Sequence, residues 1–293
     1  QVVQVVILFA LLYILKPQHP ETWSGSFLDI CKEALRAKPM LYFCGLALGG
    51  VLSTSEWWFW EVLTLIAGEF GVEALAAHAI PTQFLTIACT AVMGVGIAFN
   101  VRIGSTLAIN PEHAKLLCLW CYIVGITISA VLSLWFYHHQ PLITSMFTDN
   151  DDVLALCRQI WPHVSIYTFH VCIFLQSTGI VNALGYQWTL GKLTVAILWG
   201  VALPVIYFLS VIRHGGLLMM WKLLYLPYFV INILIAFICL TANFEQLCLE
   251  LQRRENTNSS TTTLVRKRES DMLILSTKNE KASACASRYG AIT

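Results

Sequence analysis

The stretch from Leu41 to Ile66 is long and apolar enough to cross a bilayer, yet it carries two glutamates, Glu56 and Glu61. A helix needs about 20 apolar residues to span the hydrocarbon core. An acidic side chain at that depth costs roughly 2.5–3.5 kcal/mol, so it normally faces a bundle interior or a water-filled cavity. The sequence therefore predicts a helical bundle in which both carboxylates border a cavity.

Tryptophans accompany the two acids at helical spacing. Trp60 follows Glu56 by four residues and Trp57 precedes Glu61 by four, so each acid has an indole one turn away on its own face. A desolvated organic cation gains from a carboxylate and roughly 0.5–2 kcal/mol from each aromatic face. The pattern favours a site for an organic cation. The alternative is an interfacial tryptophan belt with the acids near a helix end.

Composition extends the membrane assignment to the whole chain. Of its 293 residues, 57% are hydrophobic and 12% are charged, whereas a soluble domain is roughly 25% charged. The net charge of +1 gives no basic face for nucleic acid. The ten cysteines are scattered, most of them in apolar segments, and are interpreted as small buried hydrophobes. We expect an all-α, polytopic membrane bundle in contact with the lipid bilayer, without a metal or an organic cofactor.

The apolar pattern divides the chain into four segments. Residues 1–15 resemble the end of a helix whose beginning is missing, because the sequence opens within an apolar run and has no initiator Met. Residues 16–38 form a polar connection and residues 39–242 a lobe of six transmembrane helices. Residues 243–293 form a mostly disordered tail, because its Ser-, Thr- and Asn-rich run buries too little apolar surface to fold.

The expected spans are 41–66, 74–100, 116–137, 160–184, 193–212 and 217–241. Residues 101–115 are predicted to be a polar loop. Gln83 lies within the second span beside a proline that kinks the helix, and it is a candidate for the cavity; an interhelical hydrogen bond is the alternative. His170 lies within the fourth span and is a candidate proton relay, since the unperturbed pKa of histidine is about 6.5.

Loop charges predict the orientation of the bundle. Basic residues concentrate in alternate connections and at the start of the tail: Lys16, Lys32, Arg36, Lys38, Arg102, Lys115, Lys192, Arg253 and Arg254. The intervening connections carry Glu69, Glu73 and the acidic residues of 149–152, with Arg213 as an exception. By the positive-inside rule, the basic connections and the C-terminal tail are cytoplasmic.

Three segments, 56–62, 100–107 and 179–187, together with Glu21-Thr22-Trp23-Ser24-Gly25, resemble the multidrug and toxin extrusion (MATE) family, closest to its animal branch. The resemblance runs from Val2 to about Thr241. It implies a twelve-helix core of two six-helix lobes around a central cleft, which exports organic cations across the plasma membrane in exchange for protons. This chain corresponds to the end of the sixth helix and the C-lobe, so the missing N-lobe would be its partner.

The resemblance also implies roles for single residues. The first acid of this helix is essential for transport in the family and the second contributes, which corresponds to Glu56 and Glu61 here. Gln83 stands where animal relatives have a further acid, and Val171 aligns with an acid of the tenth helix. Ser105 replaces the usual Asn, and Asn182-Ala183 the usual Arg-Gly. These departures leave the proton stoichiometry and the substrate range open, as well as the choice between H⁺ and Na⁺.

Two other classes of function were weighed against a proton-coupled exporter. One is a membrane protein that folds as a half-transporter and moves nothing. The other is an intramembrane enzyme in which Ser53 is activated by His163 or His170. No G-x-S-x-G sequence surrounds Ser53, so the sequence favours a transporter over an enzyme.

Overall fold

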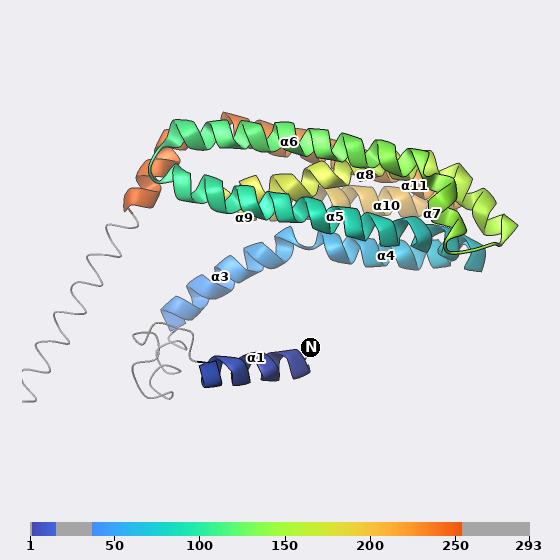
Figure 1. Ribbon diagram of the computed structural model, residues 1–293, viewed down its shortest axis with the longest axis horizontal. Coiled ribbons are helices and arrows are strands. Elements are labelled where there is room, and N and C mark those ends of the chain that lie inside the picture. The colour runs from blue at the N-terminus through green and yellow to red at the C-terminus, as the bar shows by residue number, and fades with distance from the viewer. Residues whose placement is uncertain (1, 16–36, 254–293) are drawn as a thin grey trace, which may run out of the picture. The chain divides into compact units, whose positions relative to one another are not determined.

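The computed structural model describes residues 2–15 and 37–253, and these residues form helices and no strand (Figure 1). The chain divides into two compact units, residues 1–51 and 52–293. The first unit contains α1 (Val2–Leu15) and most of α3 (Ala37–Ser53). The bounds of α1 match the helix expected at the start of the chain. The connection expected at 16–38 lies almost wholly outside the described residues.

The second unit is a bundle of long helices. Its elements are α4 (Glu56–Gly68), α5 (Val72–Leu107), α6 (Pro111–His138), α7 (Gln140–Ser145), α8 (Asp151–Ala183), α9 (Gln187–Thr194), the wide-turned π-helix η2 (Val195–Ala202), α10 (Leu203–Tyr207), the π-helix η3 (Phe208–Ile212) and α11 (Gly216–Thr241). Five stretches are long and apolar enough to cross a membrane: α5, α6, α8, the continuous helix 187–212, and α11. The expected all-α, multi-pass membrane fold is confirmed.

The expected span over 41–66 is divided into two helices. α3 ends at Ser53 and α4 begins at Glu56, with a turn over Thr54 and Ser55 between them. Three consecutive hydroxyl residues favour such a break, because Ser and Thr have modest helix propensity. Glu56 is consequently the first residue of α4, where the positive end of the helix dipole favours a carboxylate.

The prediction of a polar loop at residues 101–115 is wrong. α5 continues to Leu107, and the hydroxyl groups of Ser105 and Thr106 donate to the carbonyl oxygen of Arg102 at 3.1 and 2.7 Å. α6 then begins at Pro111, and the Asn110 side chain caps it by accepting from the His113 amide at 3.0 Å. Polar side chains extend the helix beyond its apolar part, and the cap determines where the next helix begins.

α8 is the central helix of the bundle. It has the largest buried share of the five long helices, and it packs against α5, α6 and α11. Its contact with α5 is closest at two glycines, since a Cβ built on Gly179 would collide with the carbonyl oxygen of Gly96. Small residues at such a point let two membrane helices approach backbone to backbone.

Polar side chains tie α8 to α6. The Gln176 amide donates to the carbonyl oxygen of Cys121 at 2.6 Å, and the Trp161 indole donates to the carbonyl oxygen of Phe136 at 2.8 Å. Ser133 of α6 returns a bond to the carbonyl oxygen of Ser165 at 2.7 Å. Polar groups that lie away from water need such partners, and these residues hold the two helices in register.

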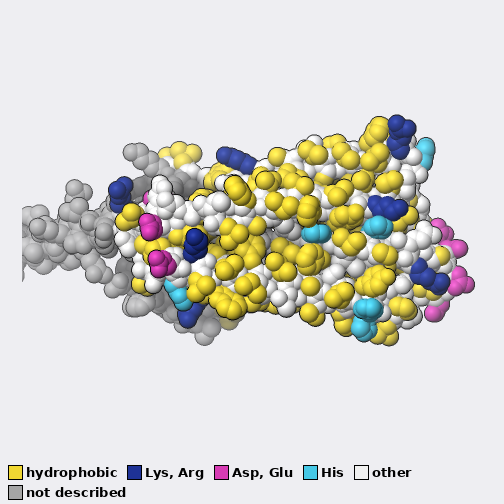
Figure 2. All heavy atoms as spheres, turned by 90° about the horizontal axis from the view of Figure 1, so that it is seen from above, with side chains coloured by type: hydrophobic (Ala, Val, Ile, Leu, Met, Phe, Trp, Pro, Cys, Tyr) yellow, Lys and Arg dark blue, Asp and Glu magenta, His cyan; other side chains and the backbone are white. Residues whose placement is uncertain are grey.

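A further helical segment, residues 244–253, follows α11 and packs beside the α5–α6 connection (Figure 1). Its Cys248 thiol and Gln252 amide both donate to the carbonyl oxygen of Ala108, at 3.5 and 3.0 Å. Part of the segment expected to be a disordered tail is therefore helical, and the rest lies outside the described residues. Figure 2 shows charged side chains mostly towards the two ends of the bundle, with hydrophobic side chains between them.

Candidate functional site

Glu56 is the one carboxylate among the described residues that is buried, with 4% of its surface exposed. The Tyr228 hydroxyl of α11 donates to its Oε1 at 2.9 Å. Tyr228 is itself fixed by edge-to-face contacts with Tyr167 and Phe174 of α8, at centroid distances of 5.0 and 5.5 Å. The carboxylate is thus oriented by a hydrogen bond from a rigid aromatic cluster.

A cavity of about 290 Å³ opens beside Glu56, between α4, α5 and α8. Five of the residues predicted from the sequence line it: Glu56, Trp57, Trp60, Glu61 and Gln83. The remaining lining residues are Thr64, Thr82, Leu85, Thr86, Cys89, Val171 and Leu175. The structure therefore brings the predicted residues of α4 and α5 together around one space, and Val171, the position expected to be acidic in relatives, faces the same space.

The two predicted indoles have different surroundings. Trp60 is partly buried and packs against Tyr167, Trp221 and His78 at centroid distances of 5.0, 6.2 and 6.5 Å. Trp57 is 43% exposed. A cation requires a free aromatic face, so Trp57 is better placed to receive a ligand than Trp60, which supports the aromatic cluster.

The two predicted acids also differ. Glu61 lies a little more than one turn after Glu56 and lines the cavity, yet its side chain is exposed in the described chain, as is that of Gln83. An exposed carboxylate keeps most of its hydration and attracts a cation weakly, whereas a buried one interacts in a lower dielectric. Glu56 is accordingly the stronger counter-charge, with Glu61 at the cavity's rim.

His170 does not line this cavity. Its ring packs against Tyr225 and Phe229 of α11, at centroid distances of 6.4 and 5.6 Å, and its backbone carbonyl accepts a hydrogen bond from Asn232 at 2.8 Å. His170 precedes Val171 by one residue, and consecutive residues of a helix point about 100° apart. A part for His170 in proton transfer stays a prediction, without a contact to Glu56 in its support.

Sequence reasoning missed Tyr228 and His78. Tyr228 follows Pro227 in the last span, and nothing in the local pattern links it to Glu56, 172 positions away. His78 is fully buried, and its Nε2 lies 3.4 Å from the Thr64 hydroxyl. Long-range partners such as these have no signal in the spacing of residues along one helix.

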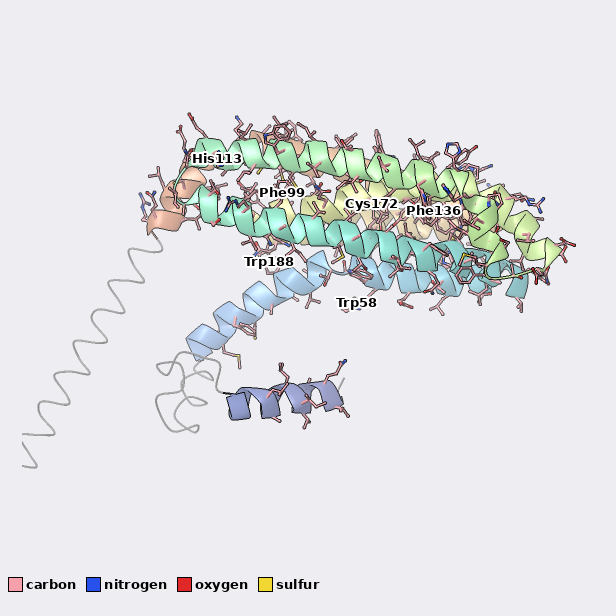
Figure 3. The ribbon with its side chains drawn as sticks, in the orientation of Figure 1. Trp58, Phe99, His113, Phe136, Cys172 and Trp188 are labelled. Carbon is pink, nitrogen blue, oxygen red and sulfur yellow. The ribbon has the colours of Figure 1, made fainter. Side chains whose placement is uncertain are left out.

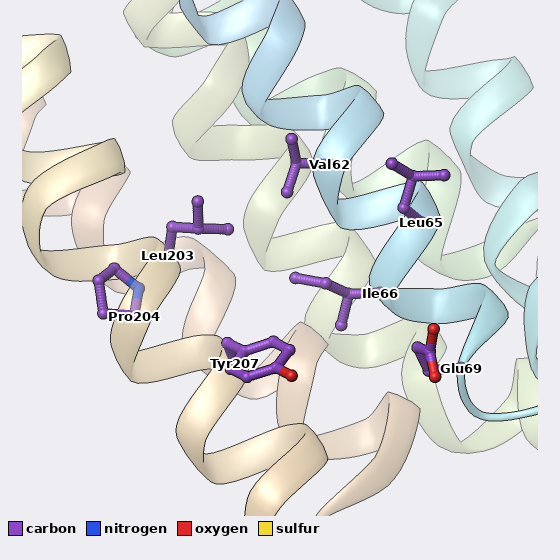
Figure 4. A pocket seen from close by; sticks show the side chains of 7 residues that line it. All are labelled: Val62, Leu65, Ile66, Glu69, Leu203, Pro204 and Tyr207. Carbon is purple, nitrogen blue, oxygen red and sulfur yellow. The ribbon is translucent and has the colours of Figure 1, made fainter.

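A second, more open groove lies between α4 and α10 (Figure 4). It is lined by Val62, Leu65, Ile66, Glu69, Leu203, Pro204 and Tyr207. Glu69 is its one acidic group and is exposed, so the groove offers aliphatic surface rather than a buried counter-charge. On the outer side of α4, Trp58 is 58% exposed and lines neither this groove nor the Glu56 cavity (Figure 3).

The groups around Glu56 suit the binding of a ligand. Within the described residues no group of three or more His, Cys, Asp or Glu side chains could hold a metal ion. What the cavity offers is one buried carboxylate, a second carboxylate at its rim, an accessible indole and several hydroxyl groups. These groups match a cation that carries apolar surface.

The chain is similar to known proteins in sequence. The MatE family model matches residues 51–208. The chain is 28% identical over 218 residues to Multidrug and toxin extrusion protein 1 of Oryctolagus cuniculus, which covers 73% of this chain and 37% of that protein. It is 28% identical over 186 residues to Multidrug and toxin extrusion protein 2 of Homo sapiens, covering 61% of this chain and 29% of that protein.

A solved structure shares the fold. The crystal structure of the eukaryotic MATE transporter AtDTX14 superposes with a TM-score of 0.68 and 15% identity, covering 86% of this chain and 56% of that one. This chain spans about a third of the length of the two extrusion proteins, 37% and 29%. Since the family model covers more than half of its residues, the chain belongs to the MatE (multidrug and toxin extrusion) family.

Proposed function

We propose that the full-length protein exports organic cations across a membrane in exchange for protons, and that Glu56 binds the two in turn. The observation that supports this most is the setting of Glu56. Its carboxylate is 4% exposed, accepts a hydrogen bond from Tyr228 and lines a cavity of about 290 Å³. Such a carboxylate has room beside it for a ligand and little water to compensate its charge.

Competition at one carboxylate explains the exchange. Removing a carboxylate from water favours its neutral, protonated form, whereas a cation beside it favours the charged form. Glu56 therefore holds either a proton or an organic cation. A proton that arrives from one side releases the cation there, and loss of that proton on the other side restores the site. The two binding events are linked with opposite sign, which is the coupling that exchange requires.

The rest of the cavity supplies affinity for the organic part of the substrate. The open face of Trp57 contributes a cation–π contact of roughly 0.5–2 kcal/mol, and Glu61 attracts the cation at the rim. Relatives named as multidrug and toxin extrusion proteins support export of varied compounds over an enzymatic reaction. The substrates are small organic cations, and the coupling ion is H⁺.

The location and orientation follow from the same reasoning. Five stretches of the described residues are long and apolar enough to cross a membrane. The membrane that we propose for this multi-pass protein is the plasma membrane. Lys115 near the start of α6, Lys192 in α9 and the residues after α11 face the cytoplasm by the positive-inside rule. An N-lobe, expected from the resemblance of the sequence, would complete the cleft in which the Glu56 cavity lies.

The test is pH-driven transport by a Glu56→Gln variant. Membrane vesicles that contain the full-length protein are given an imposed pH gradient, and uptake of labelled tetraethylammonium is measured. Glutamine keeps the size of the side chain but cannot hold an exchangeable proton, so we expect uptake to fall to that of vesicles without the protein. The matched control is Glu69→Gln, which changes an exposed acid outside the cavity and should leave uptake unchanged.

The amount of protein in the membrane is measured for both variants. Persistent pH-driven uptake by Glu56→Gln at normal abundance would refute the assignment of Glu56. Uptake that an outward Na⁺ gradient drives equally well at constant pH would refute the proton as the coupling ion.

A further inference from the structure

Glu56 lines a second cavity as well as the first. This second cavity has a volume of about 170 Å³ and is lined by Thr54, Glu56, Trp57, Met93, Gly96, Ile97, Asn100, Phe174, Leu175, Thr178, Gly179, Asn182 and Leu190. Three residues, Glu56, Trp57 and Leu175, belong to both linings. They form the wall that the two cavities share.

The two cavities follow one another along the bundle. On α5 the first is lined by residues between 82 and 89 and the second by residues between 93 and 100. The midpoints of these ranges are eleven residues apart, which corresponds to about 16 Å of helix. The order on α8 is the same, with Val171 in the first cavity and Asn182 in the second. The second cavity therefore lies nearer the end of the bundle where α5 and α8 terminate.

The second cavity has polar groups within a lining that also includes Met93, Ile97 and Phe174. Asn100, Thr178 and Asn182 contribute amide and hydroxyl groups, and Glu56 is its one charged side chain. Its volume of about 170 Å³ is well below the roughly 300–1,000 Å³ of pockets for organic ligands. It is enough for about five water molecules at roughly 30 Å³ each. Asn182 lies one residue before the end of α8, where the helix dipole favours positive charge.

The other titratable groups that interact with Glu56 do not compete for its proton at neutral pH. They are the phenols of Tyr228 on α11 and Tyr167 on α8, and the thiol of Cys89 on α5. Phenols and thiols are mainly protonated near pH 7. No lysine, arginine or histidine lines either cavity among the described residues. Glu61 is the other carboxylate that lines the first cavity, whereas Glu56 is the one titratable side chain in the described lining of the second.

We propose that the second cavity is the water-filled path by which protons pass between Glu56 and the end of the bundle that carries Arg102 and Lys192. The proposal rests on the function proposed above and assigns the organic cation and the proton to different cavities. The organic cation occupies the larger cavity with Trp57 and Glu61. The carboxyl O–H bond of Glu56 breaks towards a water molecule in the smaller cavity, which leaves a carboxylate and a hydronium ion.

The first experiment separates the two cavities by kinetics. Asn100→Leu/Asn182→Leu makes the second cavity apolar, and Gln83→Leu changes an amide of the first. In pH-driven uptake of tetraethylammonium by the full-length protein, we expect the double variant to lower kcat at least about tenfold with KM unchanged. Its kcat should also become more sensitive to replacement of H₂O by D₂O, as a slowed proton transfer requires. Gln83→Leu should raise KM and leave kcat unchanged.

A double variant with the kcat and the solvent isotope effect of the wild type would overturn the proposal. So would a double variant whose defect lies in KM, because the organic cation would then occupy the second cavity.

The second experiment does not depend on transport. Thr178→Cys places a thiol in the second cavity, and a membrane-impermeant thiol reagent is added to sealed vesicles of each orientation. We expect labelling above the wild-type background only from the side of the membrane on which α9, the helix that contains Lys192, begins. Labelling at the background level from both sides would overturn the proposal even if the Leu variants fail to fold. If Glu56→Gln retained pH-driven uptake, the proposed function would fail, whereas this labelling would still report whether the cavity holds water.

Discussion

Polar side chains on the two sides of α8 have different surroundings. Towards α6, the Gln176 amide is bonded to the carbonyl oxygen of Cys121, and the crevice around it has no volume for a water molecule. Towards α4 and α5, Asn182 lines a cavity. A polar side chain in a span is structural where a backbone group satisfies it. It is available to a ligand where it faces a cavity.

The largest effect is expected at the contact between Gly179 of α8 and Gly96 of α5, which positions the side of α8 that faces the cavities. Gly179→Val forces a side chain into the Gly96 carbonyl of α5, and overpacking of this kind costs roughly 1–3 kcal/mol or more. We expect a large loss of thermal stability in detergent and little folded protein in the membrane. Gly94→Val is the matched control, because a Cβ at Gly94 meets no atom within 4 Å. Equal stability of the two variants would contradict the packing described here.

The next effect concerns the hydroxyl group that orients Glu56. Tyr228→Phe removes a hydrogen bond to a carboxylate, and such bonds contribute roughly 1.5–3 kcal/mol. We expect slower pH-driven uptake and a lower melting temperature. Tyr225→Phe, on the same helix with its ring against His163 and His170, should change neither. If Tyr228→Phe transports at the wild-type rate, the bond does not contribute to the site.

Substitutions of two neighbouring tryptophans on α4 compare a residue that lines the cavities with one that does not. Trp57→Ala removes an indole that lines both cavities. Since a cation–π contact is worth roughly 0.5–2 kcal/mol, KM for tetraethylammonium should rise about 2- to 30-fold. Trp58→Ala removes a more exposed indole that lines neither, and its KM should equal that of the wild type. Parallel increases in KM for both variants would point to the membrane interface instead of a binding site.

The smallest effect separates two glutamines. Gln176→Leu removes the interhelical hydrogen bonds from its amide to the carbonyl oxygen and the sulfur of Cys121, and also a buried amide oxygen that has no partner. Bonds of this kind average about 0.6 kcal/mol in a membrane protein, so we expect a slight loss of thermal stability and unchanged KM. Gln83→Leu should raise KM and leave the melting temperature unchanged. The reverse pattern would exchange the structural and binding assignments of the two residues.

The helices and the acidic cavity were predictable because both depend on local sequence. Apolar runs located the five long helices of the described residues. Two acids within one apolar stretch directed attention to Glu56 and Glu61, which line the cavity. The break at Thr54 and Ser55 was not expected, since hydropathy averages over three hydroxyl residues. The extension of α5 to Leu107 was also missed. Hydropathy detects only the apolar part of a helix, and α5 continues beyond its apolar residues.

The partners of the site could not be predicted, because they depend on how helices pack. Tyr228 meets Glu56 only through the packing of α11 beside α8. Gln83 and Gln176 look alike in the sequence, and the difference between them arises from a cavity on one side and a backbone carbonyl on the other. His170 was selected for its titration range, whereas the rotation of α8 turns its ring away from the cavity towards Tyr225.

The glycine contact between α5 and α8 has a consequence for how the site can change over generations. Gly96 and Gly179 both line the second cavity, and the two backbones meet there without side chains between them. The separation of these walls is thus set by main-chain atoms. Substitutions at other lining positions of this cavity, such as Asn100 or Asn182, can alter its polarity without altering its width.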